Sequence, residues 1–190
     1  MRRRRLLQAA PLALAWQLGP RTALGGQWLA TPELPDVPLT DHLGREVDLL
    51  ELISRRPVVV NFFFTGCATV CPPQTALLQE ARRQWRTKPA LARVLVVSIS
   101  VDPLGDGPKQ LQAYAERFGV SLGEDKGWVM LTGAAKPMAR VLDAFDVPVG
   151  QADDHPALLW LGDRSRGRWT RTSSLNPPAT LTRQLEALLS

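Results

Sequence analysis

The sequence predicts an α/β fold in which a central mixed β-sheet is flanked by helices. Two runs rich in β-branched and other apolar residues, 57–64 and 93–101, are typical of strands that are covered on both faces. A segment with helical spacing of apolar residues follows each run. Strands and helices that alternate in this way form a layered α/β domain.

The other elements follow from turn residues and apolar spacing. Short strands are expected at 37–39 and 47–49, on either side of a hairpin-like turn, and later at 128–131, 157–161 and 168–171. Helical segments are expected at 49–54, 72–86, 108–118, 135–145 and 177–189. This order ends with a hairpin and a helix. It predicts a thioredoxin-like sandwich that carries an N-terminal β-hairpin extension.

The positive charge of the chain is concentrated at its beginning. The first 25 residues contain five arginines and no Asp or Glu, and without these arginines the formal charge of +5 falls to zero. The rest of the chain shows no basic stripe, so we expect no nucleic-acid partner.

The first 25 residues also resemble an export signal. Arg2–Arg5 precede a short apolar stretch, residues 6–18, and small residues follow at 23–25. The stretch is shorter than the roughly 20 residues of a membrane span, and Arg3-Arg4-Arg5-Leu6-Leu7 matches a twin-arginine export pattern.

Three parts of the chain are therefore expected. Residues 1–25 form an export signal or an N-terminal anchor, residues 26–36 form a linker, and residues 37–190 form the thioredoxin-like domain. We expect this domain in the periplasm or another extracytoplasmic space, where thiols oxidise unless they are actively reduced.

The only two cysteines, Cys67 and Cys71, lie directly after the first buried strand and before Pro72. Proline suits the first turn of a helix, so the pair is expected where a helix begins. Two soft sulfur ligands at a helix N-terminus suit thiol redox chemistry or capture of a thiophilic metal. A structural disulfide is the third interpretation, although so short a ring restricts the unfolded chain little.

The spacing of the cysteines restricts their geometry. Positions i and i+4 of a regular helix stand roughly 6 Å apart at Cβ, whereas a disulfide needs about 3.5–4.5 Å. Pro72 disfavours helical backbone at the residue before it, which predicts that Cys71 is the N-cap and that residues 67–70 form a loop. The helix N-terminus is then expected to stabilise a thiolate at Cys71.

Two sulfurs alone make a poor metal site, so a third ligand is needed. The chain contains only two histidines, His42 and His155. In a thioredoxin-like fold the loop that holds His155, before the strand at 157–161, faces the cysteine loop. His155 then either completes a Cys2His set, which suits Cu(I) or Cu(II), or is a solvated loop histidine. Asp153 and Asp154 are either its hydrogen-bond partners or loop acids. His42 is assigned to a polar turn away from the site.

Several segments resemble the Sco/SenC family of copper-binding, thioredoxin-like proteins. Phe64-Thr-Gly-Cys67-Ala-Thr-Val-Cys71-Pro72 is similar to the family's Cys-x-x-x-Cys-Pro motif. Ser98–Pro103 is similar to a family strand that ends in Val-Asp-Pro, and Trp128–Gly133 to the next strand. His155 falls where the family carries its histidine ligand. The resemblance covers residues 34–190.

The resemblance implies a metallochaperone that supplies copper to the dinuclear copper centre of cytochrome c oxidase. Cys67, Cys71 and His155 would be the copper ligands. The partner would be a copper-accepting oxidase subunit or another copper carrier, and we expect a monomer, with the N-terminus as its membrane tether if the leader is kept.

Conventional enzyme activity is not expected, but two other roles would use the same site. Some family members act as thiol reductants, so the alternative is a periplasmic thiol-disulfide oxidoreductase with Cys67 and Cys71 as its redox pair. A redox or copper sensor would also use these residues.

Some positions depart from the family pattern or have two interpretations. Pro156 follows His155 directly, where the family often has Ser or Thr, and a cis bond there would re-aim the imidazole. The short segment between Phe145 and His155 leaves little room for the acidic hairpin of some members. Asp102 is expected either to orient a ligand or to form an Asx-Pro turn. Core positions are expected for Trp85, Trp128, Trp160, Trp169, Met130 and Met138.

Overall fold

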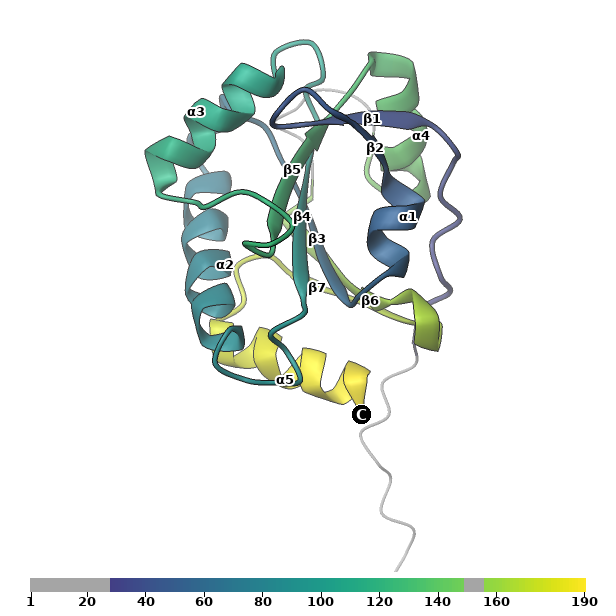
Figure 1. Ribbon diagram of the computed structural model, residues 1–190, viewed down its shortest axis with the longest axis vertical. Coiled ribbons are helices and arrows are strands. Elements are labelled where there is room, and N and C mark those ends of the chain that lie inside the picture. The colour runs from purple at the N-terminus through teal and green to yellow at the C-terminus, as the bar shows by residue number, and fades with distance from the viewer. Residues whose placement is uncertain (1–27, 149–155) are drawn as a thin grey trace, which may run out of the picture.

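The structure, a computed structural model, describes residues 28–148 and 156–190. Its strands form a seven-stranded sheet in the order β2-β1-β5-β4-β3-β6-β7 (Figure 1). The strands are β1 (Pro38–Asp41), β2 (Glu46–Asp48), β3 (Val58–Phe63), β4 (Leu95–Ser100), β5 (Trp128–Thr132), β6 (Leu158–Asp163) and β7 (Arg168–Ser173). The central trio β5, β4 and β3 is parallel, and β1 and β6 flank it in antiparallel pairing. The predicted mixed sheet of a thioredoxin-like sandwich is confirmed.

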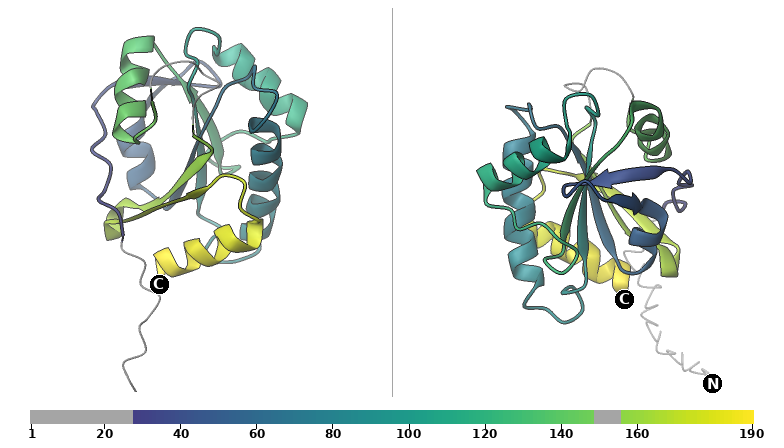
Figure 2. Two further views of the ribbon diagram at one scale, coloured as in Figure 1. Left: turned by 180° about the vertical axis from the view of Figure 1, so that it is seen from behind. Right: turned by 45° about the horizontal axis from the view of Figure 1, so that its top comes forward.

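Helices cover both faces of the sheet (Figure 2). They are α1 (Leu49–Ser54), α2 (Cys71–Trp85), α3 (Pro108–Phe118), α4 (Ala135–Ala144) and α5 (Pro178–Leu189), with a short 3₁₀ turn, η2 (Arg164–Arg166). Side chains of α2, α3 and α5 pack on one face, and those of α1 and α4 pack on the other. The predicted helix bounds agree with these to within one residue at each end, in part because α3 and α5 have proline in the first turn.

The predicted N-terminal hairpin is present and is joined to the sheet through β5. β1 pairs with β2 on one side and with β5 on the other. Asp41 closes the hairpin turn, because its carboxylate accepts from the backbone N–H of Leu43 at 2.8 Å and of Arg45 at 2.9 Å. The Arg45 guanidinium pairs with the same carboxylate at 2.7 Å.

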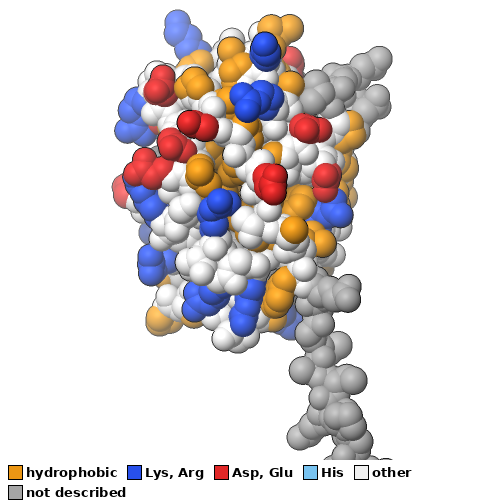
Figure 3. All heavy atoms as spheres, turned by 90° about the vertical axis from the view of Figure 1, so that its right-hand side faces the viewer, with side chains coloured by type: hydrophobic (Ala, Val, Ile, Leu, Met, Phe, Trp, Pro, Cys, Tyr) orange, Lys and Arg blue, Asp and Glu red, His pale blue; other side chains and the backbone are white. Residues whose placement is uncertain are grey.

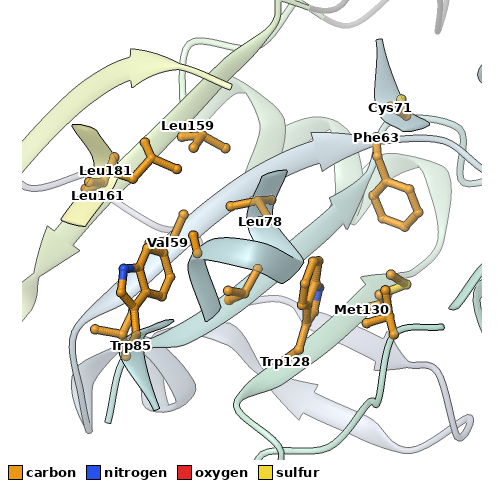
Figure 4. Close-up of a cluster of buried hydrophobic side chains, with 14 of the residues drawn as sticks. Val59, Phe63, Cys71, Leu78, Trp85, Trp128, Met130, Leu159, Leu161 and Leu181 are labelled. Atoms are coloured by element: carbon orange, nitrogen blue, oxygen red, sulfur yellow. The ribbon is translucent and has the colours of Figure 1, made fainter. Parts of the chain in front are cut away.

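One core cluster lies between the sheet and helices α2, α3 and α5. Cys71 and Trp85, the first and last residues of α2, lie at opposite ends of this cluster, with Leu78 between them (Figure 4). The Trp85 indole N–H donates to Thr182 Oγ1 on α5 at 3.0 Å. All six tryptophans and methionines expected in the core are buried, which confirms the prediction for Trp85, Trp128, Trp160, Trp169, Met130 and Met138.

The segment before β1 lies against the domain. Leu29 N–H donates to the Trp169 carbonyl oxygen at 2.7 Å, and Leu29 and Leu34 pack against the second core cluster. The Arg168 guanidinium lies over the ring of Trp28, 5.7 Å from its centroid. The described chain therefore begins beside β7. Within the described ranges, no helix combines the length and the apolar character that a membrane crossing requires.

His42 lies in the turn after β1, as predicted, and its side chain is buried there. Its side chain is 4% exposed, and its backbone N–H donates to the Met130 carbonyl oxygen at 3.1 Å. Gln112 of α3 donates to the His42 carbonyl oxygen. The buried Nδ1 atom finds no hydrogen-bond partner among residues 28–148 and 156–190. Burial lowers the pKa of His42 and outweighs the attraction of Asp41.

The free energy of unfolding should fall as the pH drops below about 6.5, the ordinary histidine pKa. The folded protein holds His42 with a lowered pKa, so in this interval the unfolded chain binds more protons and is favoured. Urea titrations at about pH 7.5 and about pH 5.5 measure the loss. His42→Gln should reduce it, and the control His155→Gln should keep it. An equal loss in both variants would contradict this role of His42.

Candidate metal centre

The cysteine loop, residues 64–70, joins the carboxyl end of β3 to the start of α2. β3 and β4 are parallel and paired from Val58↔Leu95 to Phe63↔Ser100, so the loop after β4 reaches the same edge of the sheet. β6 runs antiparallel to β3 and therefore begins at this edge. We call it the thiol edge. Three chain segments that are distant in sequence meet there.

Cys67 and Cys71 lie together at the thiol edge. Cys71 is fully buried and Cys67 is 4% exposed. The backbone N–H of Cys71 donates to Cys67 Sγ at 3.3 Å, and Thr69 Oγ1 lies 3.9 Å from the same sulfur. No disulfide joins the two thiols. The structure thus brings together two of the three predicted ligands.

The predicted N-cap is wrong by one residue. α2 begins at Cys71, and its N-cap is Val70, with φ −88° and ψ −33°. The Gln74 N–H donates to the Val70 carbonyl oxygen at 3.1 Å and closes the first turn. The missing N–H of Pro72 leaves no gap there, because the first N–H groups of a helix have no helical acceptor. The first turn therefore outweighs the local preference that Pro72 imposes on Cys71.

The two thiols differ in pKa in the opposite sense to the prediction. Burial, together with the hydrogen bond to Cys67, raises the pKa of Cys71 to about 12. Burial also acts to raise the pKa of Cys67, but hydrogen bonds from Cys71 and Thr69 outweigh it and lower that pKa. The expected thiolate at Cys71 is wrong because burial at this position outweighs the helix N-terminus. Cys67 is the thiol that ionises first.

A buried carboxylate anchors the cysteine loop to the loop after β4. Asp106 is 2% exposed and accepts from the Thr65 N–H, which lies 3.1 Å from each of its oxygens. It also accepts from Thr65 Oγ1 at 2.5 Å and from Ser100 Oγ at 2.6 Å. One side chain therefore joins the carboxyl ends of β3 and β4.

The sequence interpretation singled out Asp102 and missed Asp106. Asp102 forms a local turn, in which Oδ1 accepts from the Gly105 N–H at 3.1 Å and the carbonyl oxygen accepts from the Asp106 N–H at 2.9 Å. This agrees with the Asx-Pro interpretation. The turn brings Asp106 back to the end of β4. The sequence feature that could have indicated this role is a second carboxylate four residues after Asp102.

Helix α3 supports the same loop from one side. Tyr114 shares a hydrogen bond with Thr75 of α2 at 2.8 Å, and burial raises its pKa to about 12. Its ring packs on Phe63, with 5.1 Å between centroids. Arg117 donates to the Thr65 carbonyl oxygen at 3.4 Å and lies over the ring of Tyr114.

The third predicted ligand, His155, lies outside the described residues, as do Asp153 and Asp154. The described chain resumes at Pro156, two residues before β6 begins at the thiol edge. Over the described ranges, no three His, Cys, Asp or Glu side chains form a group that could hold a metal ion. The described part of the centre therefore supplies two soft sulfurs, a donor type that selects Cu(I), zinc or an iron–sulfur cluster.

Comparison with known proteins shows the family of this chain. A family model described as SCO1/SenC matches residues 31–190. The chain belongs to the SCO1/SenC family. A SCO1 protein homolog of Bacillus subtilis (strain 168) is 32% identical over 114 residues, which are 58% of this SCO1/SenC chain and 56% of that relative. The match thus spans little more than half of the relative's length.

Two solved structures share the fold of this SCO1/SenC chain. BsSco, described as a member of the Sco family of cytochrome c oxidase assembly proteins with a disulfide switch, has a TM-score of 0.69 and 23% identity, covering 86% of this chain and 96% of its own. ScoI of Bradyrhizobium japonicum, solved with copper bound, has a TM-score of 0.60 and 27% identity, covering 80% and 96%.

Iodoacetamide should modify Cys67 before Cys71 in the reduced, metal-free protein. Cys67 is the more exposed thiol and has the lower pKa, and the thiolate is the reactive form. The alkylation rate of Cys67 should rise with pH, with a midpoint below about 8.5, the ordinary cysteine pKa. Peptide mass mapping over time measures both rates. Cys71→Ser should label quickly and Cys67→Ser slowly, and similar rates in the two variants would contradict the assignment.

Asp106→Ala should lower the free energy of unfolding by about 3 kcal/mol, because it leaves a buried N–H and two hydroxyls without their acceptor. Asp102→Ala removes an acceptor in a partly exposed turn and should cost about 1 kcal/mol. Urea unfolding of the two variants compares the losses. Equal losses would mean that Asp106 is not the anchor of the cysteine loop.

Proposed function

We propose that this chain binds a copper ion through Cys67, Cys71 and His155 and delivers it to the dinuclear copper centre of cytochrome c oxidase. The observation that supports this most is the sulfur pair held at the edge where β6 begins, because His155 precedes β6 by three residues. Two thiolates suit Cu(I), and an added imidazole also suits Cu(II). The copper-bound ScoI of Bradyrhizobium japonicum supports the choice of metal.

Transfer of copper to a partner requires that the ion leave the site easily. Three ligands leave room for a ligand of the accepting protein to enter before the first bond breaks. The approach would be from the side of Cys67, because Cys71 is fully buried. The description of BsSco as a cytochrome c oxidase assembly protein supports an oxidase subunit as the acceptor. We also propose that the domain works outside the cytoplasm, to which residues 1–25 would direct it.

A second function, thiol-disulfide exchange, is favoured by the unequal thiols. The Cys67 thiolate would attack a disulfide of the partner, forming a mixed disulfide and releasing one partner thiolate. Cys71, after losing its proton, would then attack Cys67 Sγ. This step releases the second partner thiol and leaves a Cys67–Cys71 disulfide, which an external thiol reductant must reduce.

Copper titration of the reduced full chain tests the first function. Cu(II) should give a thiolate-to-copper charge-transfer band, which Cys67→Ser and Cys71→Ser should remove. His155→Ala should weaken Cu(II) binding by about 100-fold or more, because loss of a side chain that only hydrogen-bonds to a metal ligand already costs about 10- to 100-fold. The matched control is His42→Gln, which removes the other histidine and should bind Cu(II) like the unmodified chain.

The same variants separate the two functions. If His155→Ala binds copper as tightly as the unmodified chain, the proposed ligand set is wrong. If the reduced chain binds no copper but reduces a disulfide-bonded peptide of the oxidase copper site, the oxidoreductase function replaces copper delivery.

A further inference from the structure

The edge of the sheet opposite the thiol edge gathers arginines from segments far apart in the sequence. The pairings Val58↔Leu95 and Val58↔Gly162 place the start of β3, the start of β4 and the end of β6 side by side. Arginines flank each of these three strand ends, namely Arg55, Arg56, Arg93, Arg164 and Arg166. We call this end of the molecule the arginine edge. The strand register alone brings its charges together.

Carboxylates neutralise only part of this charge. Arg56 pairs with Glu124 at 2.6 Å and Arg166 with Asp163 at 2.8 Å. Five other arginines at this end form no ion pair with any described Asp or Glu, namely Arg82, Arg86, Arg93, Arg164 and Arg168. The pKa of Arg82 is lowered by burial and also by the charges of Arg86 and Arg56, which agrees with an excess of positive charge here.

Two neighbouring hollows indent the arginine edge. One has a volume of 350 Å³ and is lined in part by Arg55, Arg56, Arg93 and Arg166. The other, of 380 Å³, is lined in part by Arg55, Arg56, Arg82 and Arg93. In Figure 3 the lowest part of the visible face shows Lys and Arg side chains without Asp or Glu, whereas side chains of both charges mix in its upper and middle parts. Guanidinium groups bind phosphate oxygens in a bidentate manner.

The described chain begins at this same edge. Trp28 lies against Arg168, the first residue of β7, which stands opposite Asp163, the last residue of β6, in the strand register. The 27 residues before Trp28 include Arg2–Arg5 and the apolar stretch 6–18, which are the kinds of residue that favour an anionic membrane surface. This basic and apolar segment therefore joins the domain at the arginine edge.

We propose that the arginine edge rests on a membrane surface through anionic phospholipid headgroups, with the thiol edge at the opposite end of the sheet. The unpaired arginines are spread over the end of α2, the loop before β4 and the β6–β7 turn. A charge spread over several segments matches an extended layer of phosphates better than a single small anion. Each basic residue near an anionic surface adds to the attraction, which salt weakens. This inference does not depend on the proposed copper function.

Vesicle co-sedimentation of the full chain tests the proposal. The variant Arg86→Gln/Arg93→Gln removes two exposed, unpaired charges from the arginine edge. The matched control Lys109→Gln/Lys136→Gln removes two exposed charges from the first turns of α3 and α4. Both turns follow strands that end at the thiol edge. On vesicles of phosphatidylglycerol and phosphatidylcholine, the arginine variant should bind at least about tenfold more weakly than the control. Arg2–Arg5 are present in every variant and contribute equally.

Three further measurements can confirm or overturn the proposal. Arg86→Lys/Arg93→Lys keeps both charges and should bind the vesicles as well as the unmodified chain does. The loss in the Gln variant is then due to charge and not to a folding defect. Vesicles of phosphatidylcholine alone should show no difference between the arginine variant and the control. If the arginine variant binds anionic vesicles as well as the control does, the proposal is wrong. It is also wrong if inorganic phosphate releases the protein more effectively than chloride of equal ionic strength, because the arginines then form a phosphate pocket.

Discussion

The fully buried pair of parallel strands, β3 and β4, fixes where the rest of the molecule lies. Every residue of both strands is buried, and they pair in one unbroken register over six residues. Because parallel strands point the same way, the loops that follow them meet at the thiol edge and the segments that precede them meet at the arginine edge. The chemistry at one end and the charge at the other are therefore consequences of one strand pairing.

At the thiol edge, hydrogen bonds and burial act on different sulfurs. Donors from Cys71 and Thr69 converge on Cys67, whereas Cys71 is enclosed by the core cluster between α2 and the sheet. A metal binds thiolates, so its binding must displace the proton that burial holds on Cys71. At the proposed site, copper binding would thus be coupled to proton release mainly at the buried sulfur. The carboxylate of Asp106 holds the loop through Thr65, and its charge also adds to the raised pKa of Cys71.

The sequence predicted the sheet, the helix bounds and the position of the cysteines because these depend on local patterns. Apolar runs mark the buried strands, and prolines mark the first turns of helices. The prediction was wrong at Cys71 because a rule for one dipeptide competes with a complete helical turn and with burial. It missed Asp106 because the carboxylate finds its partner in Thr65, 41 residues earlier. It gave no sign that the His42 side chain is buried, because the turn is contacted by α3, whose Gln112 lies 70 residues later. His155, as a ligand, stays a prediction.

The two ends of the molecule are electrostatically separate. The six residues of β3 span about 20 Å, at about 3.3 Å per residue. At an effective dielectric constant of about 20, two unit charges this far apart interact by less than about 1 kcal/mol, so arginines at one end act only weakly on thiols at the other. The lowered pKa of Cys67 accordingly arises from hydrogen bonds of its own loop. Contact of the arginine edge with a charged surface would then change the orientation of the site and leave the acidity of its sulfurs unaltered.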